Sequence, residues 1–542
     1  MKRLLLLMAC AAAAACSADW RDTSLPPQKR AELLTAEMTL DEKIGQLTSP
    51  YGWEMYERHG DSVRLTDAFR EAVQNGHIGM LWGTFRADPW TQKDLRTGLT
   101  PQLAARLANR MQRYAVQHSR LGIPLFLAEE APHGHMAIGA TTFPTAPGQA
   151  STWNPELIER MGKVIAAEIR LQGGHICYGP VLDIVRDPRW SRTEESYGED
   201  CYLTARIGEA YVRGTGSGDL SQSRHALSTL KHFIAYGASE GGQNGGSNLL
   251  GERELRETYL PPFEAAVKAG ARSVMTAYNS VDGIPCTANR RMLTDILRGE
   301  WGFDGFVVTD YTAISEMIDH GIGDLQEVSA RALTAGTDMD MVADGFIGTL
   351  EKSLKEGKVT EADIDKACRR ILEAKYKLGL FANPYKYCDV KRAEKEVFTP
   401  EHRSIARQIA TETFVLLKNQ DNLLPLQRKG NIALIGPLAN TRANMPGTWS
   451  VAATADRYST LLEGFKNAVG SKANILYAQG SNLMYDADYQ TRATMFGREL
   501  PRGNDQELLD EALKVAAQAD VIVAALGESS EMSGESSSPS EL

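Results

Sequence analysis

The stretch Gly305-Phe306-Val307-Val308-Thr309-Asp310 is a short apolar run that ends in a carboxylate. Runs of four to eight apolar residues, rich in β-branched and aromatic side chains, are typical of buried β-strands. Similar runs recur along the chain, and amphipathic stretches of helical period separate them. The expected strands are Ile78–Trp82, Pro124–Ala128, His175–Leu182, Leu227–Phe233, Arg272–Tyr278, Gly305–Thr309 and Thr337–Met341. The expected helices include Glu156–Leu171, Glu252–Ala269, Arg290–Trp301 and Asp324–Ala335.

This alternation predicts parallel βα units over about 340 residues. Seven or eight such units favour a TIM-type (β/α)₈ barrel, and a doubly wound open sheet is the alternative. The pattern breaks at Phe381–Tyr387, where turn-forming residues gather. A second α/β unit follows, with expected helices Glu401–Leu417 and Asp505–Gln518 and expected strands Asn431–Gly436 and Asp520–Leu526. We therefore expect a barrel over 28–385, a linker over 386–400 and a second α/β domain over 401–542.

The N-terminus has the pattern of an export signal. Lys2 and Arg3 precede the apolar run Leu4–Ala15, which is too short to span a bilayer. The run ends in small residues before Cys16, which resembles a bacterial lipobox, and ordinary cleavage near the same place is the alternative. We expect residues 1–16 to be a lipoprotein-type signal peptide. The protein is then exported to the periplasm or outer membrane of a Gram-negative bacterium, and any membrane attachment is through a lipid on Cys16.

Composition narrows the classes of ligand. The chain has 59 Lys and Arg against 69 Asp and Glu, a formal net charge of −10, which argues against nucleic acid as a partner. Five cysteines follow the signal segment, and their spacing offers neither a CxxC pair nor a zinc site. We expect free or buried thiols, one disulfide being the alternative, and no metal or cofactor.

Polar side chains close most of the expected strands. In a barrel, the carboxyl ends of the strands carry the functional site, so these residues are candidates for a ring around a polar ligand. They are Glu129 and Glu130, Asp183, Lys231 and His232, Tyr278 and Asn279, Asp310 and Tyr311, and Asp338 and Asp340. A carboxylate held firmly at a strand end, as expected for Asp310, can act as a nucleophile, base or metal ligand. A sugar-cleaving enzyme needs a second carboxyl group, for which Glu130, Glu194, Glu195, Glu528 and Glu535 are candidates.

The segment Arg186-Asp187-Pro188-Arg189-Trp190-Ser191-Arg192, followed by Glu195-Ser196-Tyr197-Gly198-Glu199-Asp200, resembles the RDPRWGR…E-x-YGED signature of family 3 glycoside hydrolases. Other segments similar to this family are Met38–Leu47, Glu130–Gly134, Lys231–Phe233, Ser273–Asn279, Trp301–Asp310, Val415–Asn419 and Ile435–Pro437. The resemblance covers residues 28–542 and is greatest to the periplasmic β-glucosidase branch. It implies a (β/α)₈ barrel followed by an α/β sandwich, which we expect to be incomplete at Leu542.

The resemblance also implies an exo-acting, retaining β-glycosidase that needs no cofactor. Asp310 would be the nucleophile and Glu535 the acid/base, with Glu528 as the alternative. The contacts to sugar hydroxyl groups would fall on Glu130, Arg192, Lys231, His232 and Tyr278. The expected substrate is an oligosaccharide or other β-glycoside with a terminal non-reducing β-D-glucosyl residue.

Two departures from the family pattern concern the site, and the first bears on the substrate. Glu130 stands where many β-glucosidases have Asp, which is similar to β-D-xylosidase and α-L-arabinofuranosidase members, so these activities are the alternatives. Tyr311 stands where a Trp often follows the nucleophile. A further alternative of a different class is a non-catalytic sugar-binding lipoprotein that has kept the fold.

Overall fold

The computed structural model describes residues 19–88, 90–442, 444–447, 457–488 and 501–529, together with 532, 534, 535 and 538. Within these ranges, eight parallel strands form a barrel. They are β1 (Thr48–Ser49), β4 (Met80–Trp82), β5 (Phe126–Glu130), β6 (Ile176–Val181), β7 (Leu227–Phe233), β8 (Ser273–Thr276), β11 (Phe306–Val308) and β12 (Asp340–Met341). Six of them form one sheet in the order β11-β8-β7-β6-β5-β4.

The pair β1 and β12 closes this sheet into a barrel. β1 pairs in parallel with β12, and two further parallel bridges, Tyr51 with Trp82 and Val308 with Met339, join the pair to β4 and β11. The expected (β/α)₈ barrel is therefore confirmed, and the open-sheet alternative is wrong. β1 was not expected, because a strand of two residues has no periodic pattern to detect.

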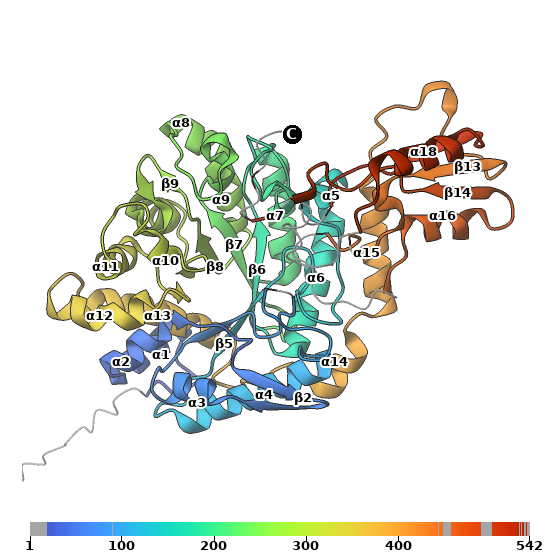
Figure 1. Cartoon of the computed structure of the whole chain (residues 1–542). Helices are drawn as coiled ribbons and strands as arrows, with labels where there is room; N and C mark the ends of the chain where they lie inside the picture. The colour runs from blue at the N-terminus through green and yellow to red at the C-terminus, as the bar shows by residue number, and fades with distance from the viewer. Residues whose placement is uncertain are drawn as a thin grey trace, which may run out of the picture.

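Helices surround the barrel (Figure 1). They are α1 (Pro27–Glu37), α2 (Leu40–Gln46), α3 (Asp67–Gln74), α4 (Pro101–His118), α5 (Ala146–Ser151), α6 (Pro155–Gln172), α7 (Cys201–Thr215), α8 (Glu252–Glu254), α9 (Leu260–Lys268), α10 (Ala313–Glu316), α11 (Leu325–Ala335), α12 (Gly345–Lys355) and α13 (Glu361–Lys377). The segments η4 (Leu255–Tyr259) and η6 (Arg291–Glu300) have the wider π-helical turn. Two short antiparallel pairs lie outside the barrel: β2 (Tyr56–His59) with β3 (Ser62–Leu65), and β9 (Ser280–Val281) with β10 (Ile284–Pro285).

Local sequence explains where the main helices begin and end. α6 begins after Asn154, whose side chain accepts a hydrogen bond from the Leu157 N–H, and Pro155 fits the first turn because it has no N–H to satisfy. It ends at Gly173, whose φ of 103° favours glycine. α7 is capped in the same way by Asp200 and ends at Gly216.

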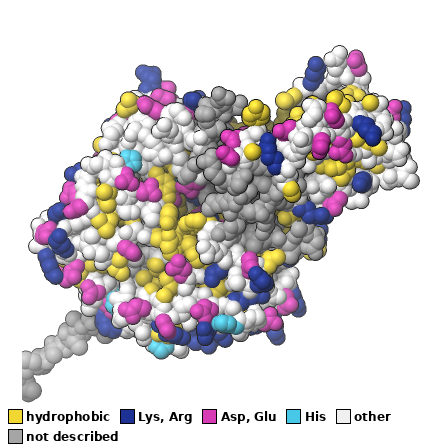
Figure 2. Space-filling view, in the orientation of Figure 1, with side chains coloured by type: hydrophobic (Ala, Val, Ile, Leu, Met, Phe, Trp, Pro, Cys, Tyr) yellow, Lys and Arg dark blue, Asp and Glu magenta, His cyan; other side chains and the backbone are white. Residues whose placement is uncertain are grey.

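A second α/β unit follows the barrel. Its three strands, β13 (Asn431–Ile435), β14 (Asn474–Ala478) and β15 (Val521–Ala524), form a parallel sheet in the order β14-β13-β15. Helices α16 (Leu461–Val469) and α18 (Asp505–Ala516) accompany this sheet, which lies at the upper right of Figure 1. Exposed apolar side chains occur here among charged ones (Figure 2), including Leu513 and Ile522.

The segment between the two units is more ordered than a simple linker. Residues 386–400, expected to be a linker, contain α14 (Val390–Glu396), which packs beside α4 and α6. The helix expected over Glu401–Leu417 is α15 (Pro400–Glu412) and ends five residues earlier than expected. The apolar residues that suggested a longer helix, Phe414 to Leu417, are 61–91% exposed, so no packing supports another turn.

The described helices include none with the length and apolarity needed to cross a bilayer. The expected lipid attachment at Cys16 lies outside the described residues. The cysteines that the structure describes, Cys177, Cys201, Cys286, Cys368 and Cys388, are free thiols.

Candidate active site

Asp310 lies two residues beyond β11, at the carboxyl end of the barrel strands. The Tyr311 N–H donates to its Oδ1 at 2.7 Å, and the side chain is 11% exposed. Burial raises the pKa of Asp310 to about 7, against the opposing effect of the positive charges on Arg192 and Lys231. The carboxylate is therefore held rigidly, and its ionisation depends on the cations around it.

Arg192 joins the barrel to the second unit. Its guanidinium donates to both carboxylate oxygens of Glu195, at 2.7 and 2.9 Å, which fixes its plane. Its Nη1 lies 3.8 Å from Oδ2 of Asp310 and donates to Oε1 of Glu535 at 3.0 Å. Because the Gly534 N–H also donates to the Ser191 carbonyl at 2.8 Å, backbone and side chain both hold Glu535 against this loop.

Lys231 and Glu130 form a second polar pair in the site. Lys231, on β7, donates to Oε2 of Glu130 at 2.8 Å. The indole N–H of Trp82, at the end of β4, donates to the other oxygen of Glu130 at 3.2 Å. Glu130 is thus held at both oxygens. The preceding Glu129 points the opposite way, as strand geometry requires, and accepts from the Phe85 N–H.

His232 lies between two carboxyl groups. Its Nδ1 is 2.7 Å from Oδ2 of Asp183, and its Nε2 is 3.5 Å from Oδ2 of Asp310. The side chains of His232 and Asp183 are completely buried. Burial raises the pKa of Asp183 to about 8 and lowers the pKa of His232 well below its ordinary value.

Aromatic side chains form one wall beside Asp310. The Tyr278 hydroxyl donates to the Tyr311 carbonyl at 2.7 Å, and the Tyr51 hydroxyl donates to the Tyr311 hydroxyl at 2.8 Å. The rings of Trp82 and Trp90 lie 5.6 and 5.4 Å from the ring of Tyr311. Tyr311 is therefore built into a packed aromatic group rather than standing alone.

The structure brings the seven site residues implied by the family resemblance close together, whereas Asp338, a further strand-end candidate, pairs with Arg298 and Arg370. Contacts link Asp310 with Arg192 and His232, and Arg192 with Glu535. The Lys231–Glu130 pair connects through Trp82 to Tyr311, which Tyr278 also contacts. Glu528, the alternative acid/base, is exposed, whereas Glu535 contacts Arg192.

Three residues of the site were not singled out from sequence. Trp82 closes an expected strand, so the strand-end criterion that selected Asp310 would also have found it. Tyr51 follows the two-residue strand β1, which gave no signal. Tyr236 packs edge to face on His232, with ring centroids 5.2 Å apart, and belongs to a glycine-rich loop without a strand pattern.

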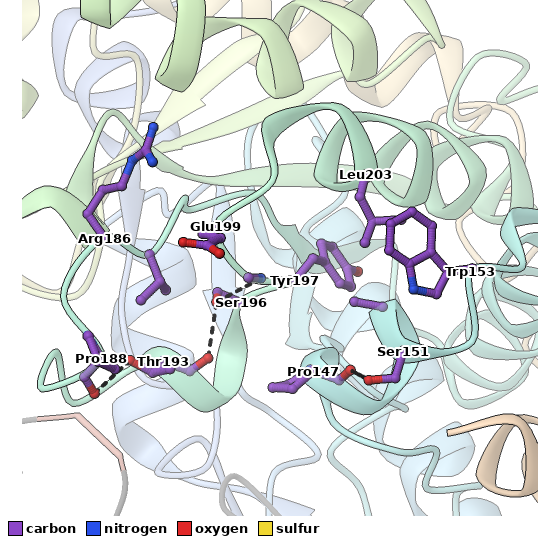
Figure 3. Close-up of a pocket in the computed structure, with 13 residues that line it drawn as sticks. Pro147, Ser151, Trp153, Arg186, Pro188, Thr193, Ser196, Tyr197, Glu199 and Leu203 are labelled. Carbon is purple, nitrogen blue, oxygen red and sulfur yellow. Dashed lines mark hydrogen bonds between the residues drawn. The ribbon is translucent and has the colours of Figure 1, made fainter. Parts of the chain in front are cut away.

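A separate hollow is lined in part by residues between Arg186 and Glu199 (Figure 3). It has a volume of about 410 Å³, and its lining includes Trp153, Arg186, Tyr197, Glu199 and Leu203. Trp153 is 70% exposed there. The lining does not include the charged residues that contact Asp310. Across the described ranges, no group of three or more His, Cys, Asp or Glu side chains is arranged to hold a metal ion.

Comparison with known proteins gives consistent results. The profile of the glycosyl hydrolase family 3 N terminal domain matches residues 39–374, and that of the family 3 C-terminal domain matches residues 414–542. The periplasmic β-glucosidase of Salmonella typhimurium is 38% identical over 524 residues, which are 95% of this chain and 64% of that protein. A β-xylosidase of Formosa agariphila is 37% identical over 80% of this chain and 60% of that protein.

The fold matches solved structures of similar proteins. The β-glucosidase of Listeria innocua in complex with glucose superposes with a TM-score of 0.79 at 31% identity. The match covers 95% of this chain and 66% of the Listeria chain. The chain thus spans just under two thirds of the length of these relatives. By its barrel, its strand-end site and both domain profiles, the chain belongs to glycosyl hydrolase family 3.

Proposed function

We propose that the chain is an exo-acting, retaining β-glycosidase, and specifically a β-D-glucosidase that hydrolyses terminal non-reducing β-D-glucosyl residues of oligosaccharides. The observation that carries this proposal is the contact of one nitrogen, Nη1 of Arg192, with both Asp310 and Glu535, at 3.8 and 3.0 Å. The two carboxylate oxygens are therefore at most about 7 Å apart, which fits the short separation of a retaining site (about 5.5 Å) better than most of the inverting range.

In this mechanism Asp310 attacks the anomeric carbon as the glycosidic C–O bond breaks, and Glu535 donates a proton to the leaving oxygen. The resulting glycosyl ester on Asp310 is hydrolysed when Glu535 takes a proton from water. Arg192 and Lys231 favour the ionised nucleophile, which burial alone would keep protonated. Glu130 and Lys231 supply polar groups for the sugar hydroxyls, and the buried ring of His232 faces Asp310 instead.

The experiment that tests this proposal is hydrolysis of an aryl β-D-glucoside by the chain and by Asp310→Ala. The variant should be inactive, while Asp319→Ala, which changes an exposed carboxylate nine residues along the chain, should keep activity. Hydrolysis retained by Asp310→Ala would contradict the assignment.

A second candidate is a β-D-xylosidase or α-L-arabinofuranosidase. Glu130 favours it, because this carboxylate is one methylene longer than Asp and is held in place by Lys231 and Trp82. Such a fixed side chain reduces the space for the C6 hydroxymethyl group of glucose, which pentoses lack. Comparing kcat/KM on aryl β-D-glucoside, β-D-xyloside and α-L-arabinofuranoside decides between the two.

For location, we propose export through the N-terminal signal segment, with a lipid on Cys16 holding the protein at the outer membrane. The apolar run and small residues before Cys16 support this proposal. The periplasmic location in the name of the Salmonella relative supports export alone. Metabolic labelling with radioactive palmitate should mark the protein, and replacement of Cys16 by Ala should remove the label.

A further inference from the structure

Asp183, His232 and Asp310 form a continuous polar row through the barrel end. Asp183 Oδ2 lies 2.7 Å from Nδ1 of His232, and Nε2 of the same ring lies 3.5 Å from Oδ2 of Asp310. The first two side chains are 0% exposed and Asp310 is 11% exposed, so the row is closed to solvent at the Asp183 end and opens only at Asp310.

Asp183 holds His232 in more than one way. It follows β6 by two residues, and β6 pairs with β7 so that Val181 is opposite Lys231. Asp183 therefore reaches the backbone as well as the ring of His232, and the His232 N–H lies 3.3 and 3.4 Å from its two carboxylate oxygens. The edge of Tyr236 packs on the ring from the side. Together these contacts leave the imidazole one orientation.

That orientation places two polar atoms that lack hydrogen bonds face to face. Neither Nε2 of His232 nor Oδ2 of Asp310 has a hydrogen-bond partner among the described residues, although both atoms are buried. Buried polar atoms without partners are uncommon and need an explanation. A small closure of the 3.5 Å gap would pair these two atoms with each other, provided that Nε2 carries a proton.

We propose that Asp183 is a positioning residue for the reaction, which orients His232 and keeps a proton on Nε2 so that this N–H faces the nucleophilic carboxylate of Asp310. The role rests on the proposed glycosidase function. The N–H can steady the Asp310 oxygen that does not attack, and it limits the directions in which the carboxylate can turn.

The number of protons held by Asp183 and His232 explains why a carboxyl group, and not a neutral acceptor, is needed next to Nδ1 of His232. Asp183 and His232 together hold two protons and no net charge: one proton lies in the hydrogen bond to Nδ1 and the other on Nε2. An amide in place of Asp183 that turns its oxygen to Nδ1–H would leave the neutral ring with a lone pair facing Asp310, whereas an amide that turns its NH2 group to Nδ1 would keep the proton on Nε2. The raised pKa of Asp183 and the lowered pKa of His232 agree with such a shared proton.

Other ionisable groups face this row and set the pH at which its proton is lost. These groups are Arg192 and Glu195 on the loop after β6, Lys231 on β7, Tyr236 on the loop after β7, Tyr278 and Cys286 in the segment after β8, and Glu535 in the second unit. Arg192 and Lys231 oppose a positive charge on His232, so the neutral pair described above is the favoured form.

The test compares Asp183→Asn with Glu168→Gln. Glu168 is the matched control, because it is 1% exposed and bonds Nδ1 of His402 at the same 2.7 Å, but on the outer helix α6. Loss of one hydrogen bond to a charged group should lower the rate of glycosylation of Asp310 by an activated 2-fluoroglucoside about 10- to 100-fold in Asp183→Asn. Glu168→Gln should leave this rate unchanged, whatever it does to the melting temperature.

The pH profile separates positioning from a purely structural effect. The deficit of Asp183→Asn should be largest near neutral pH and should shrink at high pH, where the wild-type pair has also lost the Nε2 proton. A deficit that is constant with pH would overturn the proposal.

A second readout does not depend on activity. The ¹⁵N NMR signal of His232, assigned by comparison with His232→Gln, should show a protonated Nε2 in the wild type at neutral pH. In Asp183→Asn the rate deficit should accompany an unprotonated Nε2, and a deficit with Nε2 still protonated would overturn the proposal. An unprotonated Nε2 in the wild type would overturn the proposal. If the glycosidase function itself were wrong, no β-glycoside would label Asp310, yet the NMR result would be unaffected.

Discussion

Replacing Arg192 by Gln should move the acidic limb of the activity profile to higher pH. Burial favours the protonated form of Asp310, and Arg192, with Nη1 at 3.8 Å, favours the ionised nucleophile. Two unit charges at that distance, in an effective dielectric constant of about 20, interact by about 4 kcal/mol, which corresponds to about three pH units. Glu195 and Glu535 share the same guanidinium, so we expect the limb to move by about one to two pH units.

The assay is the pH dependence of kcat/KM for 2,4-dinitrophenyl β-D-glucoside. This leaving group departs without protonation, so the profile reports the ionisation of Asp310 rather than that of the acid/base. Arg189→Gln is the matched control: Arg189 lies on the same loop, is 40% exposed and pairs with Asp187. Loss of the buried Arg192 costs stability as well, so thermal melting must show that the variant is folded at the assay temperature.

One result would refute this reasoning. If the acidic limb of Arg192→Gln stays at the wild-type pH while the rate falls equally at every pH, Arg192 does not control the ionisation of Asp310. Its contacts would then matter only for holding the loop and Glu535 in place.

Three further predictions follow from other contacts. Glu535→Gln should slow hydrolysis of an alkyl β-glucoside far more than that of the dinitrophenyl glucoside, because only the alkyl leaving group needs a proton. The control, Glu528→Gln, should hydrolyse both substrates normally. An equal loss of rate on both substrates in Glu535→Gln would argue against an acid role. Trp82→Phe removes the hydrogen bond to Glu130 and should lower kcat/KM about tenfold or more. The ratio of the glucoside rate to the xyloside rate should also change. An unchanged ratio would show that Trp82 does not set specificity. Lys375 is fully buried and its pKa is lowered to about 7 from 10.5, so its charge costs stability below pH 7 and the cost is relieved as the pH rises toward 10. The free energy of unfolding of Lys375→Met should therefore exceed that of the wild type at pH 7, by at most about 4 kcal/mol, and by less at pH 10. Denaturant titrations at the two pH values measure this difference. A difference that does not change with pH would contradict the lowered pKa of Lys375.

The barrel was predictable because its strands are short, apolar and each closed by polar residues. β7 was expected over Leu227–Phe233 and has these bounds, since all seven residues are buried and no polar alternation obscures the run. β1 was not predictable, because its two residues carry no period. The end of α15 was also missed, because Phe414–Leu417 continue the apolar composition although they pack against nothing that would sustain a helix.

The sequence predicted which residues lie in the candidate site better than it predicted which of them contact each other. Strand ends identified Glu130, Lys231, His232 and Asp310, because parallel strands bring their carboxyl ends to one rim. The contact of Arg192 with Glu535 joins residues 343 positions apart and depends on how two units meet, which no local pattern encodes. The same holds for Asp183, whose partner His232 is decided by the pairing of β6 with β7.

The guanidinium of Arg192 contacts two carboxylates, Asp310 of the barrel and Glu535 of the second unit. In the proposed mechanism, separation of the two parts would leave the barrel with its nucleophile but without its proton donor, so the ability to form a sugar ester and the ability to complete an ordinary turnover would become independent properties. If Glu535 is the acid/base, the timing of proton supply would be coupled to the approach of the second unit. A molecule whose two parts separate after the ester has formed would keep the sugar covalently bound until they meet again. The lifetime of that ester would therefore measure how often the two parts meet.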